Sequence, residues 1–260
     1  MIPEDLSDRY RDWHWEVAYH FNPGQPTYRL HREGESRFLK LHPTGSRIPD
    51  EAVRLRWAAD FLTVPRLIEY GSDGDYDWLM TEALPGVDAA ALARHPAADP
   101  RTLVTALGEG MRAFHEAVPT RECPFDFTVP TALDHVRGRL SAGLIDPAAD
   151  FHPDHAGLSA EAAVEILVAT APTISDEVVC HGDFSLPNVM LEDGSRGSKV
   201  TGYADLGSLG VSDRWADLAA CARSCDFNLG PGYAGLLFDA YGEALDEDRL
   251  AWYRLLYDLR

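Results

Sequence analysis

The most informative part of the sequence lies between residues 181 and 207. It reads His181-Gly-Asp183-Phe-Ser-Leu-Pro-Asn188 and, after a turn-rich insert, continues with Ala204-Asp205-Leu-Gly207. Short apolar runs come first in each case, at residues 178–180 and 200–204, and such runs beside polar loops predict short strands. The sequence therefore places two carboxylates and one carboxamide in loops next to strands.

The spacing of these polar groups indicates a chemistry. Phosphoryl transfer needs an acceptor for the proton of the attacking hydroxyl and hard oxygen ligands for Mg²⁺. Asn188 follows Asp183 by five residues, the spacing of the protein-kinase catalytic loop, although His-Gly-Asp stands where that loop has His-Arg-Asp. A single Asp beside a Gly is usually a turn residue. The ordered set of strand, Asp, Asn, strand and Asp205-Leu-Gly207 predicts a kinase instead.

The same residues carry a resemblance to a known family. HGDFSLPNVMLEDG from His181 and YADLGSLGVSDRWADLAACARS from Tyr203 resemble the aminoglycoside O-phosphotransferases, above all their 3′-phosphotransferase branch. Further matches support it: Asp50-Glu-Ala-Val-Arg-Leu, Asp77-Trp-Leu-Met, Cys123-Pro-Phe-Asp126, Ala142-Gly-Leu-Ile-Asp146 and Trp252-Tyr-Arg-Leu-Leu256. The resemblance implies an α+β, bilobal, protein-kinase-like fold with a small antiparallel-sheet N-lobe and a larger helical C-lobe. ATP or GTP would bind between the lobes.

The resemblance also implies roles for the catalytic-loop residues. Asp183 looks like the base that accepts the proton of a sugar hydroxyl. Asn188 and Asp205 look like the Mg²⁺ ligands. We expect His181 to order the loop rather than to transfer protons, because this arrangement already contains a base.

The N-terminal part should bind the nucleotide. Lys40 stands on a predicted strand and Glu51 early on the following helix, and in kinases such a pair fixes the phosphates. Lys199 is the only other lysine. The segment Met80-Thr-Glu-Ala83 resembles the inter-lobe hinge of the family, which implies that backbone groups of Thr81 and Ala83 bind the adenine. The loop over the phosphates is assigned to Gln25 to Thr27 within Asn22-Pro-Gly-Gln-Pro-Thr27, which has no GxGxxG pattern.

Acidic residues are the candidates for the acceptor site. A cleft lined by carboxylates would attract the ammonium groups of an aminoglycoside, and Arg223 resembles a family arginine near that pocket. Two features depart from the family: Ser208 replaces an arginine that commonly follows Asp-x-Gly, and the ending Tyr257-Asp-Leu-Arg260 lacks a strongly acidic, aromatic character. The candidate acids are Asp150, Asp154, Asp226 and Asp258.

The remaining pattern predicts two lobes, residues 1–85 for nucleotide binding and residues 86–260 for catalysis and acceptor binding. Runs before residue 86 predict antiparallel strands and one helix, for which Asp50 is the expected N-cap. The later part predicts mainly helices. The predicted strands are 13–19, 27–31, 37–42, 64–70, 78–81, 178–180 and 200–204, and the predicted helices are 51–62, 99–118, 160–171, 215–222, 233–241 and 246–259.

Composition and charge limit the class of protein. A hydrophobic share of 45% and a charged share of 25% are typical of globular domains. A net charge of −19 argues against nucleic acid and anionic membranes as partners and favours a cationic ligand. No apolar stretch approaches the roughly 18 residues of a membrane span, so we expect a cytoplasmic protein.

The four cysteines are expected to be reduced packing residues, and no zinc site is expected.

Several alternatives remain open from sequence alone. A streptomycin 3″-phosphotransferase would share these motifs. Homoserine, choline and macrolide kinases share the fold and the catalytic core, although the segments at 123–126 and 142–146 favour the aminoglycoside branch. A nucleotide-binding pseudokinase would lack one of the core residues, all of which are present. The sequence does not distinguish ATP from GTP, or a monomer from a dimer.

Overall fold

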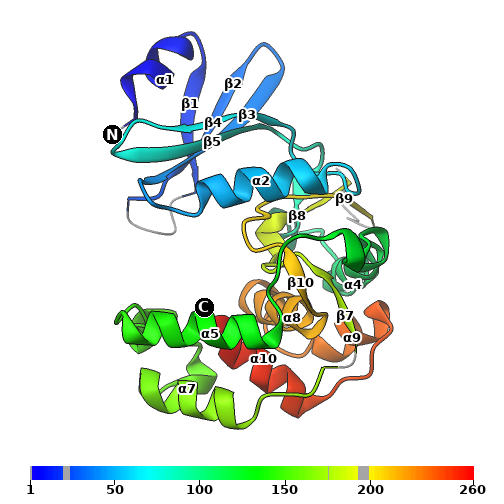
Figure 1. Cartoon of the computed structure of the whole chain (residues 1–260). Helices are drawn as coiled ribbons and strands as arrows, with labels where there is room; N and C mark the ends of the chain where they lie inside the picture. Colours follow the sequence, from blue (N-terminus) through cyan, green and yellow to red (C-terminus); the bar gives the residue numbers. More distant parts are fainter. Residues whose placement is uncertain (1, 20–23, 175, 193–198) are drawn as a thin grey trace. The chain divides into compact units, whose positions relative to one another are not determined.

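The computed structural model describes residues 2–19, 24–174, 176–192 and 199–260. The chain divides into two compact units (Figure 1). The N-terminal unit comprises Met1–Pro85 and Gly202–Gly207, and the C-terminal unit comprises Gly86–Thr201 and Ser208–Arg260. The sequence had placed all of 86–260 in one lobe, whereas the structure groups 202–207, and with it Asp205, with the N-terminal unit.

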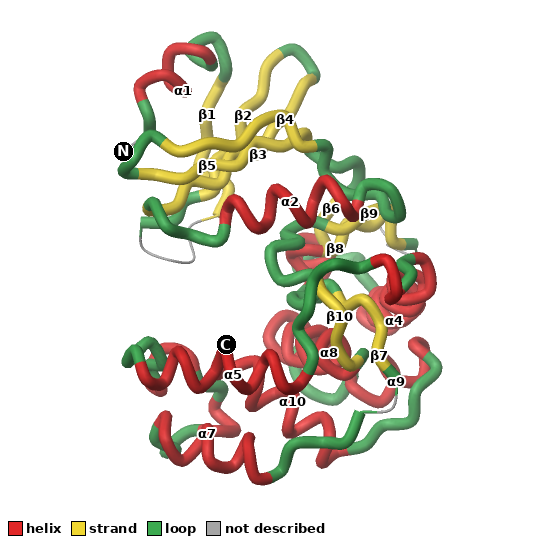
Figure 2. The backbone as a smooth tube through the Cα atoms, in the orientation of Figure 1, coloured by secondary structure: helices red, strands yellow, loops and turns green. Residues whose placement is uncertain are grey.

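A five-stranded sheet forms the N-terminal unit (Figure 2). Its strand order is β1-β2-β3-β5-β4, and every neighbouring pair is antiparallel, as the aromatic and β-branched runs predicted. The strands are β1 (His14–Tyr19), β2 (Thr27–Arg32), β3 (Glu35–Pro43), β4 (Leu67–Ser72) and β5 (Tyr76–Glu82).

The two faces of this sheet are separated by the alternation of side chains along β3 and β5. Leu39 pairs with Met80, and both belong to a core with α1 (Glu4–Arg9). Their neighbours Lys40 and Leu79 also pair, and side chains one residue apart point to opposite faces. Leu79 packs on α2, so the Lys40 side chain lies on the α2 face.

Helix α2 (Ile48–Ala58) starts earlier than the sequence predicted. Its N-cap position is Arg47, without a side-chain capping bond, so the prediction of Asp50 as N-cap was wrong. Pro49 explains the difference, because proline is favoured in the first turn of a helix, where its missing N–H costs nothing. Asp50 and Glu51 instead lie in that first turn, where carboxylates interact favourably with the helix dipole.

Helices dominate the C-terminal unit. The predicted helices are present, and Asp99 caps α4 through the N–H groups of Arg101 and Thr102. Helix α8 extends beyond the predicted Ala222 and ends before Gly230, whose φ of 88° favours glycine. The sequence did not predict α3, α5 or α6. The helices are α3 (Ala89–Ala93), α4 (Pro100–Ala117), α5 (Val129–Ser141), α6 (Pro147–Asp150), α7 (Ala160–Ala169), α8 (Trp215–Leu229), α9 (Ala234–Tyr241) and α10 (Glu247–Leu259).

Short strands and 3₁₀ turns frame the catalytic-loop motif. β7 (Glu177–Cys180) pairs antiparallel with β10 (Gly210–Asp213). A three-stranded sheet joins β6 (Val87–Asp88), β8 (Val189–Leu191) and β9 (Val200–Tyr203). The 3₁₀ turns are η1 (Thr120–Glu122), η2 (Pro153–His155) and η3 (Leu186–Asn188). The motif from His181 to Asn188 therefore runs from the end of β7 through η3 into β8.

Two further predictions concern the chain as a whole. All four cysteines are free thiols, and Cys180, Cys221 and Cys225 are buried, as expected of packing residues. Among the described residues, none of the helices combines the length and the apolar character needed to cross a membrane.

Candidate active site

Lys40 and two carboxylates form a cluster in the N-terminal unit, in which Glu51 is buried and Lys40 and Asp205 are partly exposed. The Lys40 ammonium lies 2.7 Å from Glu51 Oε1 and 2.7 Å from Asp205 Oδ1. Burial disfavours the charge of Lys40, but Asp205 and Glu51 outweigh this effect and raise its pKa. Lys40 therefore stays a fixed cation at neutral pH, as a phosphate-binding lysine must.

The backbone of Asp205 adopts an uncommon conformation. Its φ is 62°, a left-handed value that few residues other than glycine adopt and that Asp tolerates better than most. Such a conformation costs about 1–3 kcal/mol and is typical of functional sites. The structure thus holds the Asp205 carboxylate in place against a local energetic preference.

Thr81 and Ala83 lie at the end of β5. Thr81 is 9% exposed, and the Ala83 N–H donates to Ser36 O at 3.0 Å. The predicted contact of Ala83 with adenine would therefore use the Ala83 carbonyl, or it would require the N–H to give up its hydrogen bond to Ser36. Of the predicted phosphate loop, Asn22 and Pro23 lie outside the described residues, and Thr27 begins β2.

Asp183 lies in the C-terminal unit with hydrogen-bond donors on both of its carboxylate oxygens. Asn188 Nδ2 donates to Oδ2 at 3.0 Å, and the Tyr257 hydroxyl donates to Oδ1 at 2.7 Å. Asn188 Nδ2 also donates to the Asp183 carbonyl and to Ser185 Oγ. Because the amide nitrogen is used in this way, the Asn188 oxygen is the atom that can coordinate a cation, which fits a hard oxygen ligand for Mg²⁺.

A buried carboxylate that the sequence analysis missed anchors this loop. Asp217, on α8, accepts hydrogen bonds from the backbone N–H groups of His181 at 2.7 Å and Gly182 at 2.8 Å. Its Oδ2 is also 3.0 Å from His115 Nε2. Burial alone would raise the pKa of Asp217, but the bond to His115 and the other donors lower it. The one available signal was an Asp within the otherwise apolar Trp215-Ala-Asp-Leu-Ala-Ala run.

His181 and Gly182 show why the motif has its sequence. The fully buried His181 ring accepts the Asp183 N–H at Nδ1 at 3.3 Å, which supports the predicted role in ordering the loop. Gly182 has a φ of 85°, and a Cβ on it would lie 2.2 Å from the Ser208 carbonyl oxygen. The arginine of the protein-kinase motif does not fit at this position. The Ser208 carbonyl therefore packs directly against Gly182 and leaves no room for a side chain there.

The candidate acceptor acids are paired with basic groups of the chain itself. Arg223 forms an ion pair with Asp258, whose Oδ2 also lies 2.6 Å from His155 Nδ1. Arg254 lies 2.7 Å from Asp226 and 3.6 Å from Asp154. Asp150 has the longest ion pair, at 3.9 Å from Arg139, and it accepts a hydrogen bond from the Asp146 N–H at 2.9 Å. The sequence suggested carboxylates lining a cleft, whereas the structure pairs these acids with basic side chains and buries Asp258, which is 3% exposed.

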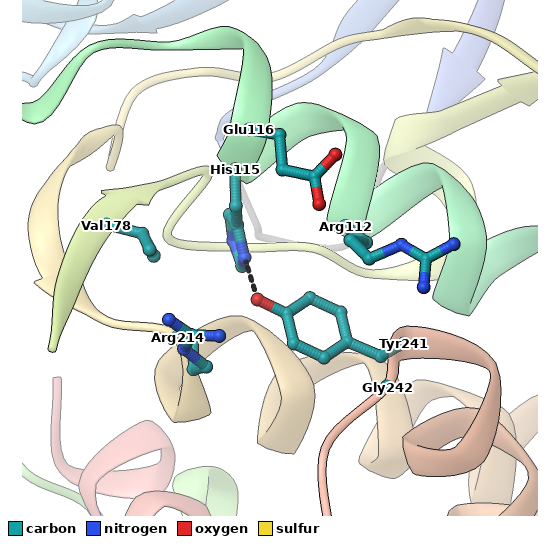
Figure 3. A pocket seen from close by; sticks show the side chains of 7 residues that line it. All are labelled: Arg112, His115, Glu116, Val178, Arg214, Tyr241 and Gly242. Atoms are coloured by element: carbon teal, nitrogen blue, oxygen red, sulfur yellow. Dashed lines mark hydrogen bonds between the residues drawn. The ribbon is translucent and has the colours of Figure 1, made fainter.

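A cavity of about 190 Å³ in the C-terminal unit lies beside the anchor of the catalytic loop (Figure 3). His115 lines it, and its Nδ1 is 2.8 Å from the Tyr241 hydroxyl. None of the predicted catalytic residues lines it. His115, Cys180 and Asp217 lie close enough together to consider a metal, but burial and the neighbouring carboxylates raise the pKa of the Cys180 thiol, which disfavours the thiolate that a metal needs.

These features define a kinase-like phosphotransferase: a strand lysine paired with a helix glutamate, an anchored His-Gly-Asp loop, and an Asn five residues further on. The chain matches the model of the "Phosphotransferase enzyme family" over residues 24–253 and belongs to that family.

Curated relatives and a solved structure support this assignment. The chain is 34% identical to an "Aminoglycoside 3′-phosphotransferase" of Streptomyces fradiae, with 98% of each chain covered. It is 33% identical to a "Streptomycin 3″-kinase" of Streptomyces griseus, covering 84% of this chain and 82% of the relative. The crystal structure of an aminoglycoside-3′-phosphotransferase of type VIII matches with a TM-score of 0.86 and 33% identity, covering 98% and 97% of the two chains. The bilobal kinase-like fold predicted from the sequence is confirmed.

Proposed function

We propose that this protein transfers the γ-phosphate of ATP or GTP to a hydroxyl of an aminoglycoside antibiotic, with the 3′-hydroxyl as the favoured acceptor, and thereby inactivates the antibiotic. The observation that carries the proposal is the similarity over 98% of the chain to an aminoglycoside 3′-phosphotransferase. The cytoplasm supplies these nucleotides, and we place the reaction there.

The residues of the N-terminal unit act on the nucleotide. Lys40 binds the phosphates as a fixed positive charge, and Glu51 holds the ammonium in place at 2.7 Å. Backbone groups of Thr81 and Ala83 are proposed to bind the base. Asp205 now pairs with Lys40, and together with Asn188 it would hold Mg²⁺, which supplies charge neutralisation at the transferring phosphate.

The residues of the C-terminal unit act on the acceptor. Asp183 takes the proton of the attacking hydroxyl, because a carboxylate within hydrogen-bond reach can serve as general base. Asp217 and His181 keep the loop backbone in the conformation that presents Asp183. Asp150, Asp154, Asp226 and Arg223 are proposed to bind the cationic sugar, and its ammonium groups would compete there with the protein's own basic side chains. Asp258 is buried and would contribute by holding Arg223 in place.

A second candidate is phosphorylation of streptomycin at its 3″-hydroxyl. It is favoured by the 33% identity to a streptomycin 3″-kinase. Both candidates use the same catalytic residues and differ in the acceptor molecule and in the hydroxyl that is phosphorylated.

The experiment is ADP and GDP release by the purified protein with Mg²⁺ and each nucleotide in turn. The acceptors are kanamycin, neomycin, streptomycin and non-antibiotic alcohols, and NMR of the product locates the phosphate. Phosphate on the 3′-hydroxyl of kanamycin supports the first candidate, and turnover with streptomycin alone supports the second. Turnover no higher with any aminoglycoside than with water contradicts the proposed substrate.

A further inference from the structure

The last turn of α10 reaches the proposed catalytic base. The Tyr257 hydroxyl donates to Asp183 Oδ1 at 2.7 Å, while Asn188 donates to Oδ2 at 3.0 Å. Each carboxylate oxygen therefore receives one donor from the chain. The terminal torsion of an Asp side chain is broad and poorly restricted by itself, so donors on both oxygens are what fix the plane of this carboxylate.

Tyr257 is itself held in place. The guanidinium carbons of Arg223 and Arg260 lie 4.9 and 4.3 Å from the centre of its ring, distances typical of cation–π contacts. Arg223 is fixed in turn by its ion pair with Asp258. Burial and the neighbouring Asp183 carboxylate raise the pKa of the Tyr257 hydroxyl, so it remains a protonated donor at neutral pH.

We propose that Tyr257 is a positioning residue for the phosphotransfer reaction. It fixes the Asp183 carboxylate so that an unshared lone pair meets the proton of the acceptor hydroxyl. This inference rests on the proposed role of Asp183 as base. Because a base must lie within hydrogen-bond reach of its proton, and a misplacement of about 1 Å costs on the order of 100-fold in rate, the loss of the Tyr257 hydroxyl affects turnover more than binding.

The same helix offers a matched control. Tyr253, four residues earlier on α10, donates its hydroxyl to Asp213 Oδ2 at 2.8 Å. Asp213 is buried and also pairs with Arg249, and it has no proposed part in the reaction. Tyr257→Phe and Tyr253→Phe each remove one tyrosine hydroxyl bonded to a carboxylate, but only the first bond involves the base.

The test compares kcat, the nucleotide Kd and the melting temperature of both variants with those of the wild type. We expect Tyr257→Phe to lower kcat about 10- to 100-fold with an unchanged nucleotide Kd and a nearly unchanged melting temperature. Tyr253→Phe is expected to lower the melting temperature and to keep kcat within about twofold of the wild type. A kcat for Tyr257→Phe within twofold of the wild type overturns the proposal, as does a loss that merely follows the melting temperature in both variants.

Acceptor-independent hydrolysis of the nucleotide separates this proposal from the identity of the acceptor. In that reaction water takes the place of the sugar hydroxyl, and Asp183 still receives the proton. A lower hydrolysis rate in Tyr257→Phe supports the positioning role even if no aminoglycoside is phosphorylated. Stimulation of the wild type by kanamycin, combined with equal rates of Tyr257→Phe and wild type in both reactions, overturns the positioning role and leaves the proposed function intact.

Discussion

Asp217 holds the backbone of Gly182, whose N–H donates to Asp217 Oδ1 at 2.8 Å. The acceptor is a fully buried carboxylate on α8, and the donor lies directly before the proposed base in the sequence. The helix thus sets the conformation of the catalytic loop through a charge-assisted hydrogen bond, which is stronger than a bond between neutral groups.

Asp217→Ala tests this anchor. The change leaves two backbone N–H groups and His115 Nε2 without their partner, and each unsatisfied buried group costs about 1–3 kcal/mol. We expect the free energy of unfolding, measured by urea denaturation, to fall by about 3 kcal/mol or more. Asp239→Asn changes an exposed carboxylate on α9 and should stay within about 0.5 kcal/mol of the wild type. Equal stability of the two variants would show that the anchor does not support the fold.

The ionisation of Asp217 should contribute to the pH dependence of the free energy of unfolding. Its pKa in the folded protein lies below the ordinary value of 3.8. A depressed carboxyl pKa contributes stability above the unfolded pKa, and this contribution is lost as the pH falls through the folded pKa. Below about pH 4, the stability of the wild type should therefore decline more steeply than that of Asp217→Ala. Parallel curves from urea denaturation between pH 2 and 7 would contradict this.

Gly182→Ala tests the close approach of two loops. The added Cβ would lie 2.2 Å from the Ser208 carbonyl oxygen, and the φ of 85° is unfavourable for alanine. We expect a lower melting temperature and a loss of most phosphotransfer. The control is Gly138→Ala on α5, where a Cβ would meet nothing within 4 Å and where alanine should stabilise the helix by up to about 1 kcal/mol. A melting temperature of Gly182→Ala equal to that of the wild type would refute the steric argument.

Lys40→Ala should weaken nucleotide binding. The change removes the fixed cation and leaves Glu51 and Asp205 as neighbouring carboxylates, which would repel the phosphates. We expect the Kd for ATP with Mg²⁺, measured by calorimetry, to rise about 10-fold or more, since a hydrogen bond to a charged group contributes about 1.5–3 kcal/mol. Lys199→Ala removes the other lysine, which is exposed, and should leave the Kd unchanged. An unchanged Kd in Lys40→Ala would contradict the assignment.

The motifs near Asp183 were readable from the sequence because they are local, and the networks that support them were not. The Asp-to-Asn spacing and the strand with Lys40 are patterns of adjacent residues. Tyr257 instead reaches Asp183 across 74 positions, and no local pattern reports such a contact. The candidate acceptor acids illustrate the same limit. The sequence shows which acids are present, but it does not show which arginine pairs with each of them.

Arg254 provides a test of how far the acceptor acids are neutralised by the protein. Its guanidinium pairs with Asp226 at 2.7 Å and with Asp154 at 3.6 Å, while Asp154 also lies 3.1 Å from His152 Nδ1. Arg254→Gln should therefore make Asp226 above all available to the ammonium groups of the antibiotic. We expect the KM for kanamycin to fall several-fold at low salt, with a smaller gain at high salt, because salt screens such charges. Arg137→Gln removes an equal charge from the exposed pair with Asp134 and should change KM little. A KM that rises in Arg254→Gln would show that Arg254 positions these acids for the acceptor instead of competing with it.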